Sequence, residues 1–246
     1  MCTLTWLREG DGYALFFNRD EKRTRKPAEP PELKSRGGVH YLAPTDADAG
    51  GTWIGVNEYG LTVCVLNHQP IPTPRPVEKT KSRGWLVDSL LDALSPADVA
   101  TRIERADMSR YQPFILVALD ARCDATTWTW AGDRVERGEL HFEDLPLTTS
   151  SFDSERVRAK RRETFASYRD QHGGVNGAML KAFHRQHDAD AGATSVCMQR
   201  EDARTVSFST ILVTGKDVAF LYCPIPPCES HEAAMEKVVV PRAALA

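Results

Sequence analysis

Hydrophobic and β-branched residues fill two runs at the start of the chain, and a polar, glycine-containing break separates them. The runs lie within residues 2–21 and the break is Glu9-Gly10-Asp11-Gly12, so the pattern predicts an antiparallel hairpin. A turn at Gly10-Asp11 brings Cys2 opposite position 19, whereas a turn at Asp11-Gly12 brings it opposite position 21. In either register Cys2 faces the tetrapeptide Asn18-Arg19-Asp20-Glu21.

A second hairpin is predicted in residues 52–67. Two apolar, β-branched runs flank Asn57-Glu58-Tyr59-Gly60, where Gly60 suits a turn position with positive φ. The hairpin ends at Asn67.

Helices are predicted mainly in the middle of the chain. Apolar residues recur at helical spacing in residues 84–94, and Ser95-Pro96 is a start signal for a second helix that ends near Ala106. Charged and amphipathic patterns predict two more helices over residues 153–171 and 176–186. The segments 22–38 and 68–83 are rich in Pro and charge without periodicity, which predicts loops.

Further strands are predicted on both sides of these helices. The β-prone runs are residues 39–42, 113–119, 126–131 with a continuation to Thr149, 195–199, 206–214 and 218–223. Strand hairpins at both ends with helices grouped between them favour an α+β fold over alternating βαβ units. We expect one domain spanning residues 1–246.

Bulk composition narrows the class of protein. The 246 residues are 41% hydrophobic and 26% charged, which is ordinary for a globular chain with one sizeable core. A net charge of -3 argues against nucleic acid as a partner. No apolar run approaches the roughly 18 residues of a membrane span, and the start of the sequence lacks a signal-peptide layout. We therefore expect a cytoplasmic protein without a membrane span.

The six cysteines include no C-x-x-C pair. Several lie in apolar runs, so reduced, buried thiols are expected for them. Cys223 and Cys228 flank a proline-rich segment and are the pair expected to join under oxidation, which a cytoplasmic location disfavours.

The first hairpin carries candidate chemistry. If Met1 is removed, Cys2 combines a thiol with a free α-amine whose pKa is about 7.7–8.0, so nucleophile and base belong to one residue. Arg19 is expected to lower the pKa of the thiol, and Asp20 to anchor the ammonium. The alternative is a chance cysteine beside a solvated Arg19-Asp20 charge pair.

Two other polar clusters have less specific patterns. The basic run 22–26 can hold a phosphate or carboxylate of a substrate, or simply be solvated. His184, His187, Asp188 and Asp190 are metal-ligand types, but no further ligand has recognisable spacing, which favours a polar helix end. We expect neither a metal nor another cofactor.

Motifs in both hairpins resemble a known family. Met1-Cys2-Thr3 followed by Asn18-Arg19-Asp20-Glu21, together with the Gly-Gly-Thr-Trp-x-Gly-Val-Asn stretch from Gly50 to Asn57, resembles the NRDE family, also called the transport and Golgi organisation family. That family is similar to the N-terminal nucleophile (Ntn) hydrolases of the choloylglycine hydrolase and penicillin acylase type. The resemblance implies a four-layer αββα sandwich of two antiparallel sheets.

The resemblance also implies catalytic roles. Cys2 corresponds to the nucleophile, while Arg19 and Asp20 correspond by residue type, because the order Asn18-Arg19-Asp20 departs from the hydrolases' Arg-Asn-x-Asp. Asn67 matches the asparagine whose amide helps form the oxyanion hole. The alternative role for Asn67 is a cap at a strand end.

Further residues are candidates for substrate binding. The hydrolases have a second active-site asparagine where this chain reads Leu147 to Phe152, and a hydroxyl of Thr149 or Ser150, or the main chain, can substitute for it. Ser151 with Glu155 can instead cap the following helix. Arg156 faintly matches a functional arginine at a helix start. The complete substrate-binding set is Asn18, Thr52, Trp53, Ser150 and Arg156.

Taken with the resemblance, these residues predict hydrolysis or acyl transfer at a linear amide or thioester through an acyl-Cys2 intermediate. The substrate is then a small-molecule acyl amide or acyl thioester. The alternative is a non-catalytic protein on the same fold that binds or carries a small-molecule or lipid-type ligand.

Overall fold

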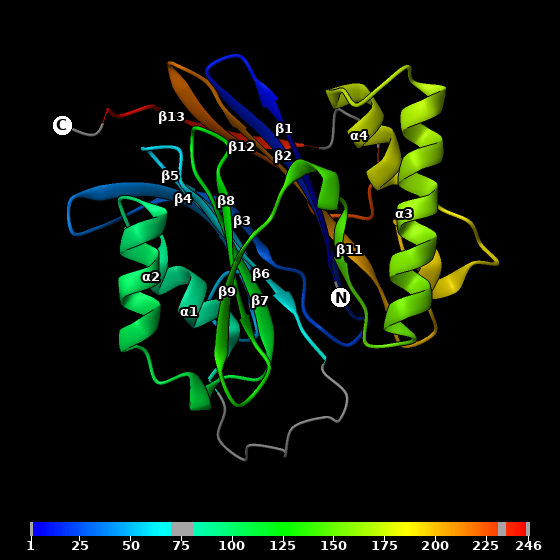
Figure 1. The fold of residues 1–246 in the computed structure, drawn as a ribbon, viewed down its shortest axis with the longest axis horizontal. Helices are drawn as coiled ribbons and strands as arrows, with labels where there is room; N and C mark the ends of the chain where they lie inside the picture. The colour runs from blue at the N-terminus through cyan, green and yellow to red at the C-terminus, as the bar shows by residue number, and fades with distance from the viewer. Residues whose placement is uncertain (1, 70–80, 231–234, 245–246) are drawn as a thin grey trace.

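Two antiparallel sheets face each other, and helices cover both outer faces (Figure 1). The computed structural model describes residues 2–69, 81–230 and 235–244. One sheet has the strand order β10-β1-β2-β11-β12-β13, and the other runs from β3 to β9 in chain order. Helices α3 and α4 pack on the first sheet, whereas α1 and α2 pack on the second. The predicted αββα sandwich is confirmed.

The elements have the following bounds. The strands are β1 (Cys2–Glu9), β2 (Gly12–Lys22), β3 (Glu29–Arg36), β4 (Val39–Thr45), β5 (Ile54–Asn57), β6 (Thr62–Asn67), β7 (Phe114–Leu119), β8 (Ala125–Trp130), β9 (Val135–Glu139), β10 (Leu147–Thr149), β11 (Ala203–Val213), β12 (Asp217–Cys223) and β13 (Glu236–Pro241). The helices are α1 (Arg83–Leu90), α2 (Pro96–Arg105), α3 (Ser154–Gln171) and α4 (Gly177–Arg185), with 3₁₀ turns at Met108–Arg110, Phe142–Asp144 and Gly192–Thr194.

Both hairpins form as predicted. Gly10 has a φ of 55° and Glu9 pairs with Gly12, so the turn is Gly10-Asp11. Gly60 has a φ of 79° in the turn between β5 and β6. Strand β2 is buried along nearly its whole length; α4 packs on one of its faces, and on the other Tyr13 hydrogen-bonds Thr62 of β6 in the second sheet.

The prediction of one long loop over residues 22–38 is wrong. Strand β2 extends to Lys22, and β3 forms the edge of the second sheet with a register shift between Glu29 and Glu32. An edge strand tolerates proline and presents charged side chains to solvent, so its sequence resembles that of a loop. Of the other predicted loop, residues 70–80 lie outside the described residues.

The segment 195–199 is not a strand. The Cys197 N–H donates to Gln186 O at 2.8 Å, and Cys197 forms a disulfide with Cys228. The expectation of a reduced thiol at residue 197 is therefore wrong, and Cys228 pairs with Cys197 rather than with Cys223. Strand β13, which pairs with β12, was not predicted.

No helix in the described ranges is long and apolar enough to cross a membrane.

Candidate active site

Cys2 lies between two strands that both present polar residues. It pairs with Arg19 on β2 and with Thr149 on β10, so the first of the two predicted registers is the one observed. Across the ladder Cys2 and Arg19 share a face of the sheet, and both line a cavity of about 610 Å³. Thr52, Trp53 and Asn67 also line this cavity, which we call the Cys2 cavity.

The Cys2 thiol is buried, with 6% of the residue exposed. Burial raises its pKa to about 11, and the nearby carboxylates of Asp20 and Glu21 act in the same direction. The main-chain N–H of Asp20 hydrogen-bonds the sulfur, which partly opposes this rise. Arg19 is not among the groups that shift the pKa of this thiol, so the lowering that we expected from Arg19 is not seen.

Arg19 is engaged with other groups in the cavity wall. Its Nη2 donates to Asp46 Oδ2 at 2.7 Å, and its guanidinium lies 3.9 Å from the centroid of the Trp53 ring. This ion pair and cation–π contact fix the guanidinium.

The tetrapeptide divides between the two faces of the sheet, because successive side chains of a strand point in opposite directions. Arg19 and Glu21 line the Cys2 cavity, whereas Asn18 and Asp20 contact residues on the helix-covered face. Asn18 Nδ2 donates to His184 O at 2.9 Å. The structure therefore does not bring the Asn18 side chain into the cavity for which we predicted it.

The Asp20 carboxylate contacts side chains from two elements that are distant in sequence, β11 and α3. Its Oδ1 accepts from Thr205 Oγ1 at 2.6 Å, and its Oδ2 lies 3.8 Å from Arg161 Nη2. Among the described residues, the buried Oδ2 has no hydrogen-bond donor. One carboxylate oxygen is thus available to a further donor beside the start of β1.

Arg161 is the main site residue that we did not predict. It is fully buried, and its Nη1 donates to Thr3 Oγ1 at 2.6 Å and to Thr148 Oγ1 at 2.9 Å. The signal for it was present in the helix pattern: Val157, Arg161 and Phe165 are spaced by four and form the buried stripe of α3. An arginine within an inward stripe indicates a buried ion pair or network.

Asn67 ends β6 and is half-buried in the cavity wall. Its side-chain amide makes no hydrogen bond to any residue of the described ranges, which leaves both N–H donors available. The structure brings Cys2, Arg19 and Asn67 to one cavity, as the two hairpins predicted.

The remaining predicted residues have different surroundings. Thr52 Oγ1 donates to Ile54 O at 2.8 Å, so its hydroxyl stabilises the local turn. Ser150 hydrogen-bonds the main chain of Phe152 and lines a neighbouring cavity of about 770 Å³ instead of the Cys2 cavity. Arg156 is exposed in the first turn of α3 and lines neither cavity.

Thr149 occupies the position opposite Cys2 on β10. Its buried Oγ1 has no hydrogen-bond partner within the described part of the chain. Of the hydroxyls considered as substitutes for the hydrolases' second asparagine, Thr149 is therefore the one adjacent to Cys2.

Part of the basic run 22–26 reaches the site. Lys22 and Arg25 line the Cys2 cavity, and Arg25 forms ion pairs with Asp46 and Asp48. The histidine-containing segment, by contrast, uses His184 for hydrogen bonds to Thr5 and Asn18.

Two facing antiparallel sheets between helical layers, with a cysteine at the start of an inner strand, define the class of Ntn-hydrolase-like folds. Solved structures of other proteins share this fold at low sequence identity. One is a penicillin V acylase from Agrobacterium tumefaciens, with a TM-score of 0.58 and 12% sequence identity; the match covers 91% of this chain and 83% of that chain. Another is a Caenorhabditis elegans ortholog of N-acylethanolamine-hydrolyzing acid amidase, with a TM-score of 0.58 and 13% identity, covering 86% of this chain and 92% of that chain. A third is a C2A mutant of a conjugated bile acid hydrolase from Clostridium perfringens, with a TM-score of 0.55 and 13% identity, covering 97% of this chain and 92% of that chain.

Within that class the sequence itself identifies the family. The family model Transport and Golgi organisation 2 matches residues 1–213, so the chain belongs to this family. A comparison with curated proteins finds no match.

Proposed function

We propose that this protein is an Ntn-type cysteine amidohydrolase or acyltransferase that acts on a small-molecule acyl amide or acyl thioester. The observation that carries the proposal is the pairing, in one cavity, of the Cys2 thiol with the unengaged amide of Asn67. A nucleophile and a fixed oxyanion donor are the two groups that acyl transfer needs most.

The proposed reaction requires removal of the residue that precedes Cys2. The freed α-amine takes the thiol proton as the sulfur attacks the acyl carbon, since a thiol with a pKa of about 11 does not ionise beforehand at neutral pH. Asp20 Oδ2, which forms an ion pair with Arg161 and has no hydrogen-bond donor among the described residues, accepts a hydrogen bond from the resulting ammonium. Asn67 donates to the oxygen that becomes negatively charged.

Collapse of this intermediate breaks the bond to the leaving group. The ammonium returns its proton to the departing amine or thiol, and the acyl group remains on Cys2 as a thioester. Water or an acceptor then attacks the thioester with the amine again as base, which releases the acyl product and restores the thiol.

The second candidate is a binding protein that keeps the cavity without turnover. Two observations favour it: the raised pKa of Cys2, and a threonine opposite Cys2 where the related hydrolases use an amide. It predicts reversible ligand binding without any covalent adduct.

Intact-mass spectrometry separates the two. Purified protein is incubated with a panel of acyl amides and acyl thioesters, beside a Cys2→Ala control. We expect a chain that starts at residue 2 and an acyl adduct that the control lacks. Quantitative retention of Met1 in protein from the native host, or ligand binding without an adduct or product for any panel member, contradicts the enzyme proposal.

A further inference from the structure

The helix that follows the second hairpin contributes a cationic side chain to the Cys2 cavity. Arg83 is the first residue of α1, is half-buried, and lines the cavity together with Lys81 and Ser82. Its Nη1 donates to Pro113 O at 3.0 Å. This hydrogen bond uses one donor of the guanidinium and leaves the others for a partner.

Glycines set the position of this end of α1. A Cβ on Gly51 would lie 2.4 Å from the carbonyl carbon of Gly84, so the two backbones approach too closely for any side chain at residue 51. The Thr52 N–H donates to Gly84 O at 3.1 Å across the same contact. The Gly-Gly-Thr segment therefore joins the wall of the Cys2 cavity directly to the start of α1.

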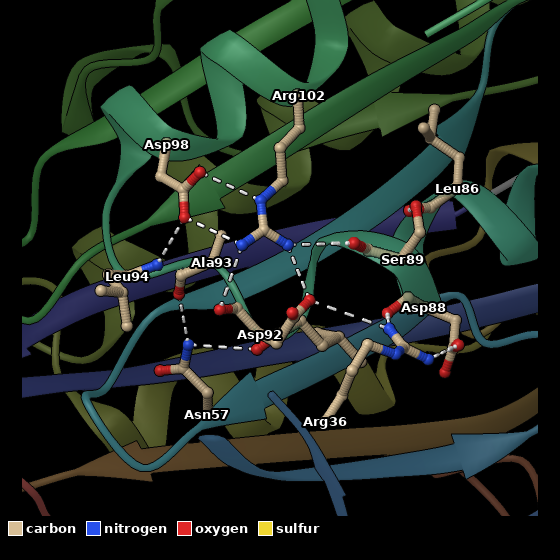
Figure 2. A network of polar contacts seen from close by, with 11 residues as sticks. Arg36, Asn57, Leu86, Asp88, Ser89, Asp92, Ala93, Leu94, Asp98 and Arg102 are labelled. Carbon is tan, nitrogen blue, oxygen red and sulfur yellow. Dashed lines mark hydrogen bonds and ion pairs between the residues drawn. The ribbon is translucent and has the colours of Figure 1, made fainter. Parts of the chain in front are cut away.

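The other end of α1 is fixed by the rest of the same motif. A Cβ on Gly55 would lie 2.6 Å from Leu91 Cδ1, and Asn57 Nδ2 donates to Leu91 O at 3.1 Å and to Ala93 O at 2.7 Å. Figure 2 shows Asn57 in this network. The Gly-Gly-Thr-Trp-x-Gly-Val-Asn motif thus holds α1 at both ends.

Ion pairs reinforce this position. Arg36 on β3 binds Asp88 of α1, and Arg102 of α2 donates to Asp92 Oδ1 at 2.7 Å, as Figure 2 shows. With the helix held in this way, Arg83 is a preorganised rather than a freely moving cation.

Arg83 forms no ion pair in the part of the chain that the structure describes. Within the described ranges no carboxylate lies within 4.0 Å of its guanidinium. Among the described residues, the carboxylates that line the Cys2 cavity are Glu21 and Asp46, and both form ion pairs with Arg19 and Arg25. Burial lowers the pKa of Arg83, and the nearby charge of Arg25 acts in the same direction, whereas the more distant carboxylate of Glu21 partly opposes this lowering.

We propose that Arg83, assisted by Lys81, forms a subsite for an anionic group, a carboxylate or a phosphate, on the substrate that reacts at Cys2. The proposal rests on the function proposed above and specifies its substrate class. A guanidinium with free donors suits either oxyanion in a bidentate arrangement. Lys22 and Arg25 add positive potential on the same cavity wall.

The first test measures the electrostatic potential at Cys2 in the absence of any substrate. Alkylation of Cys2 by anionic iodoacetate and by neutral iodoacetamide is followed by peptide mapping. The rate with iodoacetate divided by the rate with iodoacetamide is then compared with the same ratio for free cysteine. We expect a higher ratio in the wild-type protein, a loss of about fivefold or more in Arg83→Gln, and near-wild-type behaviour in Arg83→Lys. Arg158→Gln, which removes an equal charge from the wall of the neighbouring cavity, is the matched control and should change the ratio little.

The second test uses three acyl amides with one acyl chain: N-octanoylglycine, N-octanoylethanolamine and its O-phosphate. We expect wild-type kcat/KM to favour one or both anions over the neutral compound, and Arg83→Gln to abolish that preference. The member preferred identifies carboxylate or phosphate as the group bound.

Failure of each proposal has a different signature. An unchanged alkylation ratio in folded Arg83→Gln overturns the subsite, whether or not the protein turns over any amide. A ratio that falls as expected, with no turnover or adduct for any compound, retains the subsite and rejects the enzymatic function.

Discussion

Thr205 Oγ1 donates a hydrogen bond of 2.6 Å to Asp20 Oδ1, directly across the ladder between β11 and β2. The same hydroxyl accepts from the Met198 N–H at 2.8 Å. Because Met198 follows disulfide-bonded Cys197, the carboxylate is tied through Thr205 to a covalently fixed segment. Asp20 is thereby oriented from the side of the sheet opposite the Cys2 cavity.

This contact predicts that stability depends on a hydroxyl at position 205. Thr205→Val keeps the shape of the side chain but leaves a buried carboxylate oxygen without its donor and the Met198 N–H without its acceptor, so we expect a loss of about 1–3 kcal/mol in the free energy of unfolding. Thr205→Ser should lose much less. Urea denaturation followed by circular dichroism measures each value.

Thr210 is the matched control on the same strand. It is 2% exposed, and its Oγ1 has no hydrogen-bond partner within the part of the chain described. Thr210→Val therefore removes no hydrogen bond and should be neutral or slightly stabilising. Equal losses for the two valine variants would mean that the hydrogen bonds of Thr205 to Asp20 and Met198 contribute nothing specific.

The raised pKa of Cys2 predicts how its reactivity depends on pH. With a pKa of about 11, the thiolate fraction grows tenfold for each pH unit between 7 and 10, and alkylation by iodoacetamide should follow it. Peptide mapping after brief labelling isolates the rate at Cys2 from the half-exposed Cys123. A rate that levels off near pH 8 would show instead that the thiolate forms close to neutrality.

The turn chemistry explains why the register of the first hairpin was predictable to within two alternatives. The sequence left two registers open, with position 19 or position 21 opposite Cys2, and the observed turn at Gly10-Asp11 fixes every pair up to Cys2 and Arg19. Successive side chains of a strand point to opposite faces of the sheet, so Asn18 and Asp20 lie on one face and Arg19 on the other. Which of the two faces is covered by helices depends on the whole fold. For that reason Asn18 was expected in the cavity and lies outside it.

Long-range partners were not predictable from local patterns. Arg161 reaches Asp20 only because α3 packs on the first sheet, and the disulfide joins Cys197 to Cys228 across 31 residues of sequence. The close contact between Gly51 and Gly84 was also not predictable, because no local sequence pattern indicates that two glycines far apart in the chain meet. By contrast, the position of Asn67 at the cavity was predictable, because the local pattern of the second hairpin places Asn67 at its end.

Asn67 and Gln112 provide a paired test of the oxyanion assignment. Both carry amides on the cavity wall, but only Asn67 ends the second hairpin, and our proposal assigns the oxyanion donor to Asn67. With an amide or thioester substrate found in the screen, Asn67→Ala should slow acyl transfer about 10²–10³-fold, the usual effect of losing one donor. Alkylation of Cys2 should stay near the wild-type rate, because that reaction forms no oxyanion.

Gln112→Ala serves as the control for a general loss of cavity shape. It should reduce turnover far less than Asn67→Ala does. Wild-type turnover in a folded Asn67→Ala variant would assign Asn67 to strand capping alone.

His184 predicts a pH dependence of stability that is independent of the proposed reaction. It is fully buried between Asn18 and Thr5, and its pKa is lowered to about 3, first by burial and then by the nearby charge of Arg161. In the unfolded chain the pKa returns to about 6.5. Between these values the unfolded chain binds a proton that the folded chain does not, so stability is unaffected above pH 6.5 and falls below it, by up to about 1.4 kcal/mol per pH unit.

The measurement is the free energy of unfolding in urea at pH 7.5, 6.5, 5.5 and 4.5. Carboxylates also titrate in this range, so the informative quantity is the difference between the wild-type protein and His184→Gln at each pH. His184→Gln should be the less stable protein at pH 7.5, where it lacks the two hydrogen bonds of the ring, and the difference should shrink as the pH falls because only the wild type loses the histidine contribution. His141→Gln replaces an exposed histidine and should run parallel to the wild type throughout. A constant difference between His184→Gln and the wild type from pH 7.5 to 4.5 would show that His184 can be protonated inside the folded protein.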